Sequence, residues 1–79
     1  MNNAAPPKAT VRRLTLYLRE LEHLIERGVE NVSSRQLAES LGLSDAQVRK
    51  DLGYFGQFGR RGVGYRVEPL RARLRRIPG

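Results

Sequence analysis

The sequence lacks several residues on which enzymes and metal proteins depend. It has no cysteine, and His23 is its single histidine. The absence of cysteine excludes disulfides, thiolate zinc sites and a cysteine nucleophile, and one histidine cannot build a histidine metal cluster. No apolar run approaches the roughly 20 residues that span a membrane, and residues 1–7 lack the charged and apolar regions of a signal peptide. These absences predict a cytoplasmic protein that is not an enzyme, binds no metal and does not enter a membrane.

Chain length sets a second limit. The 79 residues suffice for one small domain or for a piece of a larger protein. A domain of this size buries only about 60% of its unfolded surface, which leaves little room for an enclosed cofactor pocket. We expect a disordered lead over residues 1–7, one domain over residues 8–77, and the start of a linker at residues 78–79.

Positive charge is what the sequence has in excess. Fifteen lysine and arginine residues against eight acidic ones give a net charge of +7, and 13 of the 15 are arginine. Residues 1–43 carry a net charge of only +1, whereas residues 44–79 carry +6. Arginine suits bidentate contact with phosphate and guanine. A basic excess gathered in one half of the chain therefore predicts a polyanionic partner, with nucleic acid favoured over a membrane.

Apolar spacing predicts three helices in the first part of the chain. Apolar residues over 11–25 recur at intervals of three and four, and Gly28 would end that helix. Residues 29–32 alternate apolar and polar side chains, which suits a short extended segment. Two S-x-x-Q capping boxes, at residues 33–36 and 44–47, predict the starts of two further helices.

The connection between the last two of these helices is too short for an antiparallel pair. Gly42 would end the first of them, and Ser44 would begin the next. Two helices joined in this way cross at a steep angle, as in a helix-turn-helix. Ala38 is small where the helices approach, Gly42 permits a positive φ in the turn, and Val48 anchors the second helix. A generic corner of two helices without a role in DNA binding is the alternative interpretation.

The helix that begins at Ser44 has two different faces. Its apolar stripe consists of Val48, Leu52 and Phe55. Its other faces carry residues of types that read DNA, namely Gln47, Arg49 and Lys50, with Tyr54 beside them. Glutamine pairs bidentately with adenine and arginine with guanine. Ser44 and Asp45 are placed to bond phosphate or base amino groups, or Asp45 only favours the helix dipole.

We interpret Asp51 as an acid that restrains a neighbouring basic side chain, and Gly53 as a fraying helix end or a point of close packing.

Residues 56–67 predict a β-hairpin with a basic tip. Glycines flank Arg60 and Arg61, and apolar and basic residues alternate over 65–67 on the return. Two arginines at such a tip suit a minor groove or phosphate groups. An ordinary solvated turn is the alternative.

The last segment predicts another helix, which would begin at Glu68–Pro69. Its apolar face consists of Leu70, Leu74 and Ile77. We expect this face to pack on the first helix or on a partner.

A continuous run of short motifs extends from residue 49 to residue 65. It reads Arg-Lys-Asp-Leu at 49–52, Tyr-Phe-Gly at 54–56, Phe-Gly at 58–59 and Arg-Gly-Val-Gly-Tyr at 61–65. Together with residues 7–10, 13–14, 17 and 32–34, this run closely resembles the N-terminal winged-helix domain of the Rex family of redox-sensing transcriptional repressors. The likeness covers residues 6–77. It implies a fold that is mainly α with a small β-hairpin, a winged helix-turn-helix with a three-helix core, a wing and a C-terminal helix.

The resemblance also implies a function. Rex-like proteins are homodimers that repress genes of fermentative and respiratory metabolism and bind inverted-repeat operators in double-stranded DNA when NADH is low relative to NAD. Their C-terminal Rossmann domain binds the nucleotide, and NADH releases the protein from DNA. Since the sequence contains no such domain, we expect this chain to bind DNA but neither to bind NADH, which belongs to the full-length protein, nor to switch by itself.

By the same resemblance, three groups of residues are expected to contact DNA. The recognition helix would carry Ser44, Asp45, Ala46, Gln47, Arg49 and Lys50. The wing would carry Phe58, Gly59, Arg60, Arg61 and Gly62. Phosphate contacts would come from Lys8, Arg12, Ser33, Ser34, Arg35 and Tyr54. Gly53 departs from the serine of the family, which affects only a polar contact made at that position.

A basic protein-interaction or dimerisation module is the alternative function. Its docking face would be the apolar face of the last helix, and its charge would serve solubility. RNA binding is disfavoured, because the five aromatic residues include no pair laid out as a stacking platform. An enzyme is disfavoured further, since no nucleophile with an adjacent base, carboxylate pair or phosphate loop is found.

Overall fold

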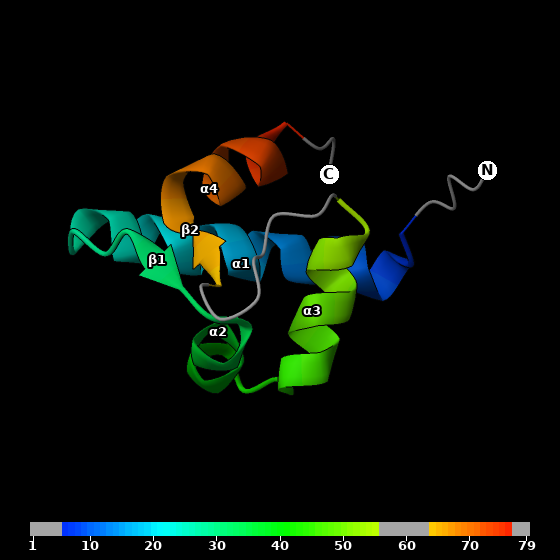
Figure 1. The fold of residues 1–79 in the computed structure, drawn as a ribbon. Helices are drawn as coiled ribbons and strands as arrows, with labels where there is room; N and C mark the ends of the chain where they lie inside the picture. The colour runs from blue at the N-terminus through cyan, green and yellow to red at the C-terminus, as the bar shows by residue number, and fades with distance from the viewer. Residues whose placement is uncertain (1–5, 56–63, 77–79) are drawn as a thin grey trace.

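The helix order follows the predicted one and places the third helix across the first. The computed structural model of the chain describes residues 6–55 and 64–76. Within these ranges the elements follow in the order α1 (Lys8–Glu26), β1 (Asn31–Val32), α2 (Ser34–Leu41), α3 (Asp45–Gly53), β2 (Tyr65–Arg66) and α4 (Val67–Arg75). In Figure 1, α1 runs through the middle of the molecule, with α4 on one side and α2 on the other, while α3 crosses its N-terminal half.

The first helix begins and ends where local backbone chemistry requires. Pro7 precedes its first turn, and the Val11 N–H donates to the Pro7 carbonyl at 3.1 Å. The helix ends where Gly28 adopts a φ of 79° and the Val29 N–H donates to the Leu24 carbonyl. Its buried side chains are Thr10, Leu14, Tyr17 and Leu21. The predicted apolar stripe therefore does face the core.

The two helix starts at Ser33 and Ser44 are confirmed, but only the first has a complete capping box. The Ser33 hydroxyl accepts from the Gln36 N–H at 3.0 Å, and the Gln36 side-chain oxygen Oε1 accepts from the Ser33 N–H at 2.8 Å. Ser44 likewise accepts from the Gln47 N–H at 3.0 Å. The Gln47 side chain, however, donates to Asp51 in the next turn. A buried acceptor has therefore taken the place of the reciprocal cap.

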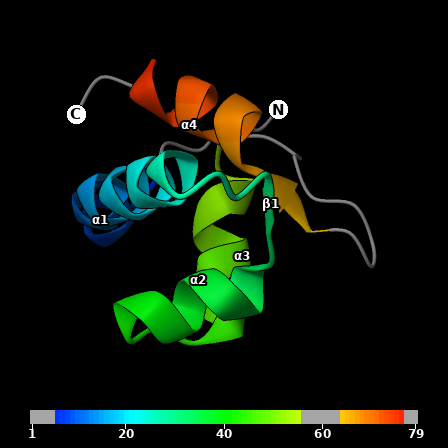
Figure 2. The same ribbon diagram turned by 90° about the vertical axis from the view of Figure 1, so that its left-hand side faces the viewer.

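The predicted helix-turn-helix is also confirmed. Gly42 adopts a φ of 72° at the end of α2, and the Leu43 N–H donates back to the Ala38 carbonyl at 2.8 Å. Ala38 and Val48 are both buried where the helices meet. Figure 2 shows α2 and α3 crossing at a steep angle.

The small sheet joins two distant segments instead of forming a local hairpin within the described residues. β2 pairs with β1 antiparallel, in the register Asn31 with Arg66 and Val32 with Tyr65. The prediction of a return strand was right for residues 65–66 but wrong for Val67, whose N–H donates to the Glu30 carbonyl at 2.9 Å as α4 begins. The predicted outgoing strand and tip, residues 56–63, lie outside the described residues.

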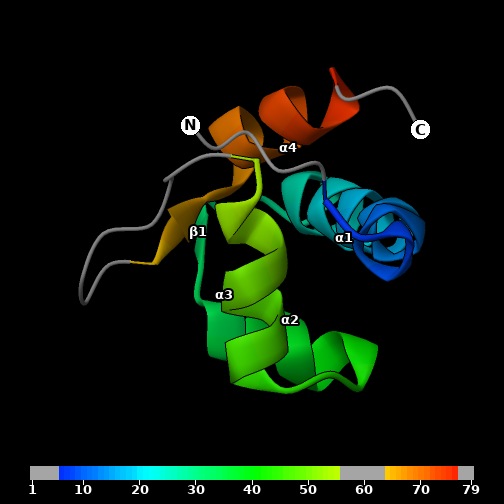
Figure 3. The same ribbon diagram turned by 90° about the vertical axis from the view of Figure 1, so that its right-hand side faces the viewer.

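The last helix packs on the first and begins one residue earlier than expected. Leu70 and Leu74 are both 0% exposed, and all three ribbon views place α4 along α1 (Figures 1 to 3). Arg73 ties α4 to the end of α3, because its Nε donates to the Phe55 carbonyl at 3.2 Å. The alternative of a docking face on this helix is therefore wrong for Leu70 and Leu74, while Ile77 lies outside the described residues. None of the helices within residues 6–55 and 64–76 has the length and hydropathy of a membrane-spanning segment.

Gly53 provides a test of the helix assignment. It is the last residue of α3, it is exposed, and a Cβ built on it would meet no atom within 4 Å. The end of a helix is therefore confirmed at this position, and close packing is wrong. We expect Gly53→Ala to stabilise the domain by about 0.5–1 kcal/mol in urea denaturation, because alanine loses less backbone entropy in a helix. Gly42→Ala is the control of opposite sign, since its φ of 72° disfavours alanine. A loss of stability in Gly53→Ala would contradict the assignment.

Candidate nucleic-acid interface

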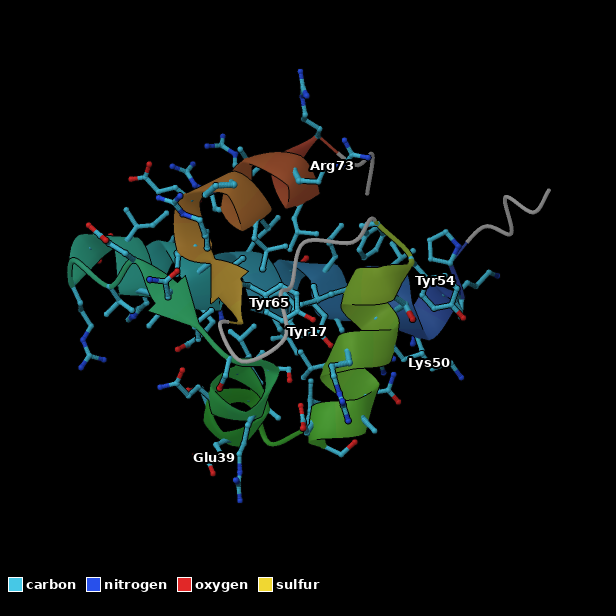
Figure 4. The ribbon with its side chains drawn as sticks, in the orientation of Figure 1. Tyr17, Glu39, Lys50, Tyr54, Tyr65 and Arg73 are labelled. Carbon is cyan, nitrogen blue, oxygen red and sulfur yellow. The ribbon has the colours of Figure 1, made fainter. Side chains whose placement is uncertain are left out.

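The third helix buries one face and leaves a basic face in solvent. Its buried side chains are Val48, Asp51 and Leu52. Its exposed residues are Ala46, Arg49, Lys50 and Gly53, and the Arg49 side chain is 63% exposed. In Figure 4, Lys50 and the half-buried Tyr54, one turn apart, lie on the side of α3 away from α2. The structure thus presents the predicted recognition residues Arg49 and Lys50 to solvent side by side.

Asp45 links the two helices of the helix-turn-helix. It accepts a hydrogen bond from the Ser34 hydroxyl at the start of α2. The same oxygen lies 3.6 Å from the Arg49 Nε one turn along α3. Two of the predicted DNA contacts, Ser34 and Asp45, therefore bond to each other, and Asp45 orients Arg49 instead of serving only the helix dipole.

A cluster of polar side chains around Asp51 joins α3 to α1. Asp51 is 0% exposed. Arg13 reaches it with two nitrogens, Nε at 2.5 Å from Oδ2 and Nη2 at 3.0 Å from Oδ1. The Thr10 hydroxyl donates to Oδ1 at 2.9 Å, and the Tyr17 hydroxyl donates to Oδ2. Three residues of the first turns of α1 thus hold one carboxylate of α3, and Gln47 adds a fourth donor from α3 itself. We call Thr10, Arg13, Tyr17, Gln47 and Asp51 the Asp51 cluster.

The cluster identifies the basic side chain that Asp51 restrains. Its basic partner is Arg13, 38 residues away in sequence, and not a neighbour on its own helix. A buried carboxylate needs such partners, because an unpaired buried charge is strongly destabilising. The Asp51 cluster therefore fixes the angle at which α3 crosses α1, and with it the direction in which Arg49 and Lys50 point.

The pKa values in the cluster follow from burial and hydrogen bonding. Burial alone would raise the pKa of Asp51, but the hydrogen bonds from Arg13, Tyr17 and Thr10 outweigh it and hold that pKa below its ordinary value. The hydrogen bond to Asp51 raises the pKa of Arg13. Burial, together with the bond to Asp51, raises the pKa of Tyr17. Near neutral pH the cluster therefore holds a carboxylate, a guanidinium and a neutral phenol that donates.

The lowered pKa of Asp51 predicts a loss of stability in acid. The folded state holds this carboxylate ionised below the ordinary pKa of about 4, so unfolding takes up a proton in that range. The contribution of Asp51 is complete above pH 4 and declines as the pH falls through the pKa of the folded state. We expect the difference in unfolding free energy between the wild type and Asp51→Asn, measured with urea from pH 7 to pH 2, to shrink below pH 4. A difference that stays constant over this range would contradict the assignment.

The strand β2 brings Tyr65 close to α3. Tyr65 is half-buried against the core and lies within electrostatic range of Arg49 and Asp45. Burial raises the pKa of Tyr65, Arg49 opposes this effect, and Asp45 adds to it. Figure 4 shows Tyr65 and Tyr17 in the middle of the molecule, whereas Glu39 points outward from α2. The return strand of the predicted wing is therefore anchored beside α3.

The other residues predicted to contact DNA differ in their exposure and in the interactions that they already make within the domain. Lys8 and Arg12 are exposed on the first turns of α1, the part that Thr10 and Arg13 join to α3. Ser33 is used by its capping box, and Arg35 is exposed, with its Nε 4.0 Å from Glu39. Ser44 caps α3 and is exposed. The predicted wing contacts Phe58, Gly59, Arg60, Arg61 and Gly62 lie outside the described residues.

Sequence reasoning missed the cluster, although the sequence held a signal for it. Asp51 follows Val48 by three residues and precedes Phe55 by four, so it lies on the apolar stripe of its own helix. An acid on such a stripe requires a partner from another element. Thr10 and Arg13 gave no comparable signal, because their side chains are common on exposed helix faces.

The described residues offer no metal site. Among residues 6–55 and 64–76, no group of three His, Cys, Asp or Glu side chains is placed to hold an ion. A hollow of about 590 Å³ lies between the end of α1 and the start of α4, and its charged lining residues are Glu30, Arg66 and Glu68. Two carboxylates disfavour a phosphate group there.

Comparison with protein families and curated proteins finds a family and several relatives that the chain resembles in sequence. The model of the family described as "Putative DNA-binding protein N-terminus" matches residues 7–53. The chain is 59% identical over 73 residues to the redox-sensing transcriptional repressor Rex of Syntrophomonas wolfei, an alignment that covers 92% of this chain and 35% of that protein. It is 51% identical over 74 residues to Rex of Chloroflexus aurantiacus, covering 94% of this chain and 35% of that protein. The chain thus spans about a third of the length of the curated relatives it matches.

Solved structures confirm the winged-helix fold. The crystal structure of RSP in complex with β-NAD+ and operator DNA matches with a TM-score of 0.88 and 43% identity, over 94% of this chain and 34% of that one. The crystal structure of RSP in complex with β-NADH matches with a TM-score of 0.80 and 39% identity, over 94% of this chain and 33% of that one. A third structure, of RSP as a Rex-family repressor, has a TM-score of 0.81.

Proposed function

Because this chain belongs to the family of N-terminal DNA-binding domains of Rex repressors, we propose that it recognises operator sequences in double-stranded DNA. The observation that carries this proposal is the basic face of α3, which stays in solvent while the Asp51 cluster holds the opposite face in the core. The similar RSP structure in complex with operator DNA supports it. The domain is a binding module without catalytic chemistry.

Each group of predicted residues has a role in this proposal. α3 enters the major groove, where Arg49 and Lys50 reach guanine edges or phosphates and Gln47 reaches adenine. Asp45 restrains Arg49 at 3.6 Å, which limits the directions in which this guanidinium can point. The wing arginines Arg60 and Arg61 contact the minor groove. Phosphate contacts come from Lys8 and Arg12 on α1, and from Ser33, Ser34, Arg35 and Tyr54.

The proposal extends to the whole protein. We infer that residues 8–77 form the operator-binding domain of a redox-sensing repressor, that NADH and NAD act on it through a separate nucleotide-binding domain, and that the full-length protein is a homodimer on an inverted repeat. The names of the relatives and the NAD+ and NADH complexes of RSP support this inference. Since a repressor acts on the bacterial chromosome, the protein would work in the cytoplasm.

The test compares two arginines at opposite ends of the molecule. Arg49 lies on α3, and Arg27 is exposed at the end of α1 that points away from α3 in Figure 1. Affinities are measured by fluorescence anisotropy for an inverted-repeat duplex and for a shuffled duplex. We expect Arg49→Ala to reduce the preference for the repeat about tenfold, the order of one bidentate contact, and Arg27→Ala to preserve it.

Wing contacts have a different signature in the same experiment. Arg61→Ala should weaken binding to both duplexes equally and reduce the slope of log affinity against log salt concentration by about one. Equal affinity of the wild type for the two duplexes would overturn the proposal. Self-association that is insensitive to salt, without DNA binding, would favour an interaction module instead.

A further inference from the structure

A buried carboxylate fixes a side chain that the proposed function places in the major groove. The Gln47 Nε2 donates to the Asp51 Oδ1 at 2.9 Å, one turn along α3. Gln47 is half-buried, whereas Asp51 is fully buried. The side chain that would read a base is therefore oriented before any DNA arrives.

The chemistry of the pair permits only one orientation of the amide. An ionised carboxylate accepts hydrogen bonds and donates none. If the Gln47 amide turned over, its carbonyl oxygen would face the Asp51 Oδ1, and two acceptors would oppose each other in a buried place. Asp51 cannot turn to relieve this contact, because Thr10, Arg13 and Tyr17 hold both of its oxygens.

A fixed amide presents its donor and its acceptor in a fixed order. The Gln47 nitrogen carries two hydrogens, so the bond to Asp51 leaves one hydrogen and the carbonyl oxygen for a base. Adenine offers the matching pair in the major groove, an N7 acceptor beside an N6 donor. In the inverted base pair these groups lie on the other strand. An amide that cannot turn over therefore distinguishes A·T from T·A, whereas a free amide can adapt to either.

We propose that Asp51 is a positioning residue for base recognition, which holds the Gln47 amide so that the domain prefers adenine on one strand at the base pair that Gln47 contacts. The inference rests on the proposed function, since it requires α3 to lie in the major groove. It assigns Asp51 a role in specificity in addition to its role in the core.

The first experiment inverts each A·T pair of the repeat in turn. It measures the affinity of the wild type, Asp51→Asn, Gln47→Ala and the double variant for each duplex. We expect inversion of one pair to weaken wild-type binding about tenfold. Asp51→Asn should reduce this penalty to about twofold at that pair alone, because an amide at position 51 both donates and accepts and lets Gln47 turn over. Gln47→Ala identifies the pair by losing the same penalty, and Asp51→Asn in that background should change the profile no further.

Thr10→Val is the matched control. It removes a hydrogen bond of similar length to the same carboxylate oxygen, 2.9 Å from Oδ1, but leaves Gln47 bonded to Asp51. A purely structural role for Asp51 predicts that Thr10→Val and Asp51→Asn change the inversion profile alike. The proposal predicts that only Asp51→Asn changes it. Retention of the full penalty in Asp51→Asn, or an equal reduction at every pair, would overturn the proposal.

A second measurement needs no variant and stays decisive if Asp51→Asn does not fold. NMR detects the scalar coupling across the hydrogen bond between the Gln47 Nε2 and the Asp51 carboxyl carbon. We expect this coupling in the free domain and in the complex with the repeat. Its loss on binding would overturn the proposal, because Gln47 would then read the base after leaving Asp51. Equal binding of repeat and shuffled duplexes by the wild type would overturn the proposed function itself, and the inference with it.

Discussion

Asp51→Ala is expected to destabilise the domain by about 3–5 kcal/mol, the range found when one partner of a buried ion pair is removed. The variant leaves Arg13 without its carboxylate and the buried hydroxyls of Thr10 and Tyr17 without their acceptor. Each unsatisfied buried group adds a cost of its own. Urea denaturation followed by circular dichroism measures the loss. A loss of this size is a large fraction of the free energy of unfolding of a small domain.

Glu39→Ala is the control for the loss of an acidic side chain. Glu39 is 75% exposed, and its oxygen lies 4.0 Å from the Arg35 Nε. Exposed ion pairs contribute about 0–1 kcal/mol, so we expect a change within that range. If Asp51→Ala cost no more than Glu39→Ala, the Asp51 cluster would not hold α3 against α1.

Gly64→Ala is expected to destabilise the domain by about 2–5 kcal/mol. Gly64 has a φ of 84°, a conformation that costs other residues about 1–2 kcal/mol. A Cβ on Gly64 would also lie 2.7 Å from the Val32 carbonyl oxygen and 3.2 Å from the Ser33 Cα. Both contacts are with backbone, so β2 would have to move away from β1, at a further cost of about 1–3 kcal/mol. Urea denaturation measures the total.

Gly28→Ala separates the two causes. Gly28 has a similar φ of 79°, but a Cβ there would meet no atom within 4 Å. We therefore expect it to show the conformational cost alone, about 1–2 kcal/mol. A loss in Gly64→Ala no larger than that in Gly28→Ala would show that the close approach of Gly64 to β1 does not matter.

The features that the sequence predicted correctly depend on interactions between residues that are close together in the chain. The starts of α2 and α3 depend on Ser33 and Ser44, which bond amides three residues away. The turn between the helices depends on Gly42, which alone must adopt a positive φ there. Such signals lie within a few residues of each other, so periodicity and capping rules detect them.

The features that the sequence did not predict depend on contacts between segments that are far apart in the chain. The partners of Asp51 come from α1, and β2 pairs with a strand that precedes it by more than thirty residues. Nothing in residues 65–67 indicates that the chain would turn into a helix at Val67, because the bond that begins α4 goes to Glu30. For the same reason the sequence predicted that the Gln47 side chain would complete a capping box or contact DNA, whereas Asp51 holds its amide.

The most direct test of the central claim is a residue-resolved NMR titration of the domain with the inverted-repeat duplex and with the shuffled duplex. Specific recognition through α3 predicts that the amides of residues 44–50 shift together with those of residues 59–62, and more strongly with the repeat. Shifts confined to the terminal arginines Arg73, Arg75 and Arg76 with both duplexes, or no shift in either segment, would contradict it.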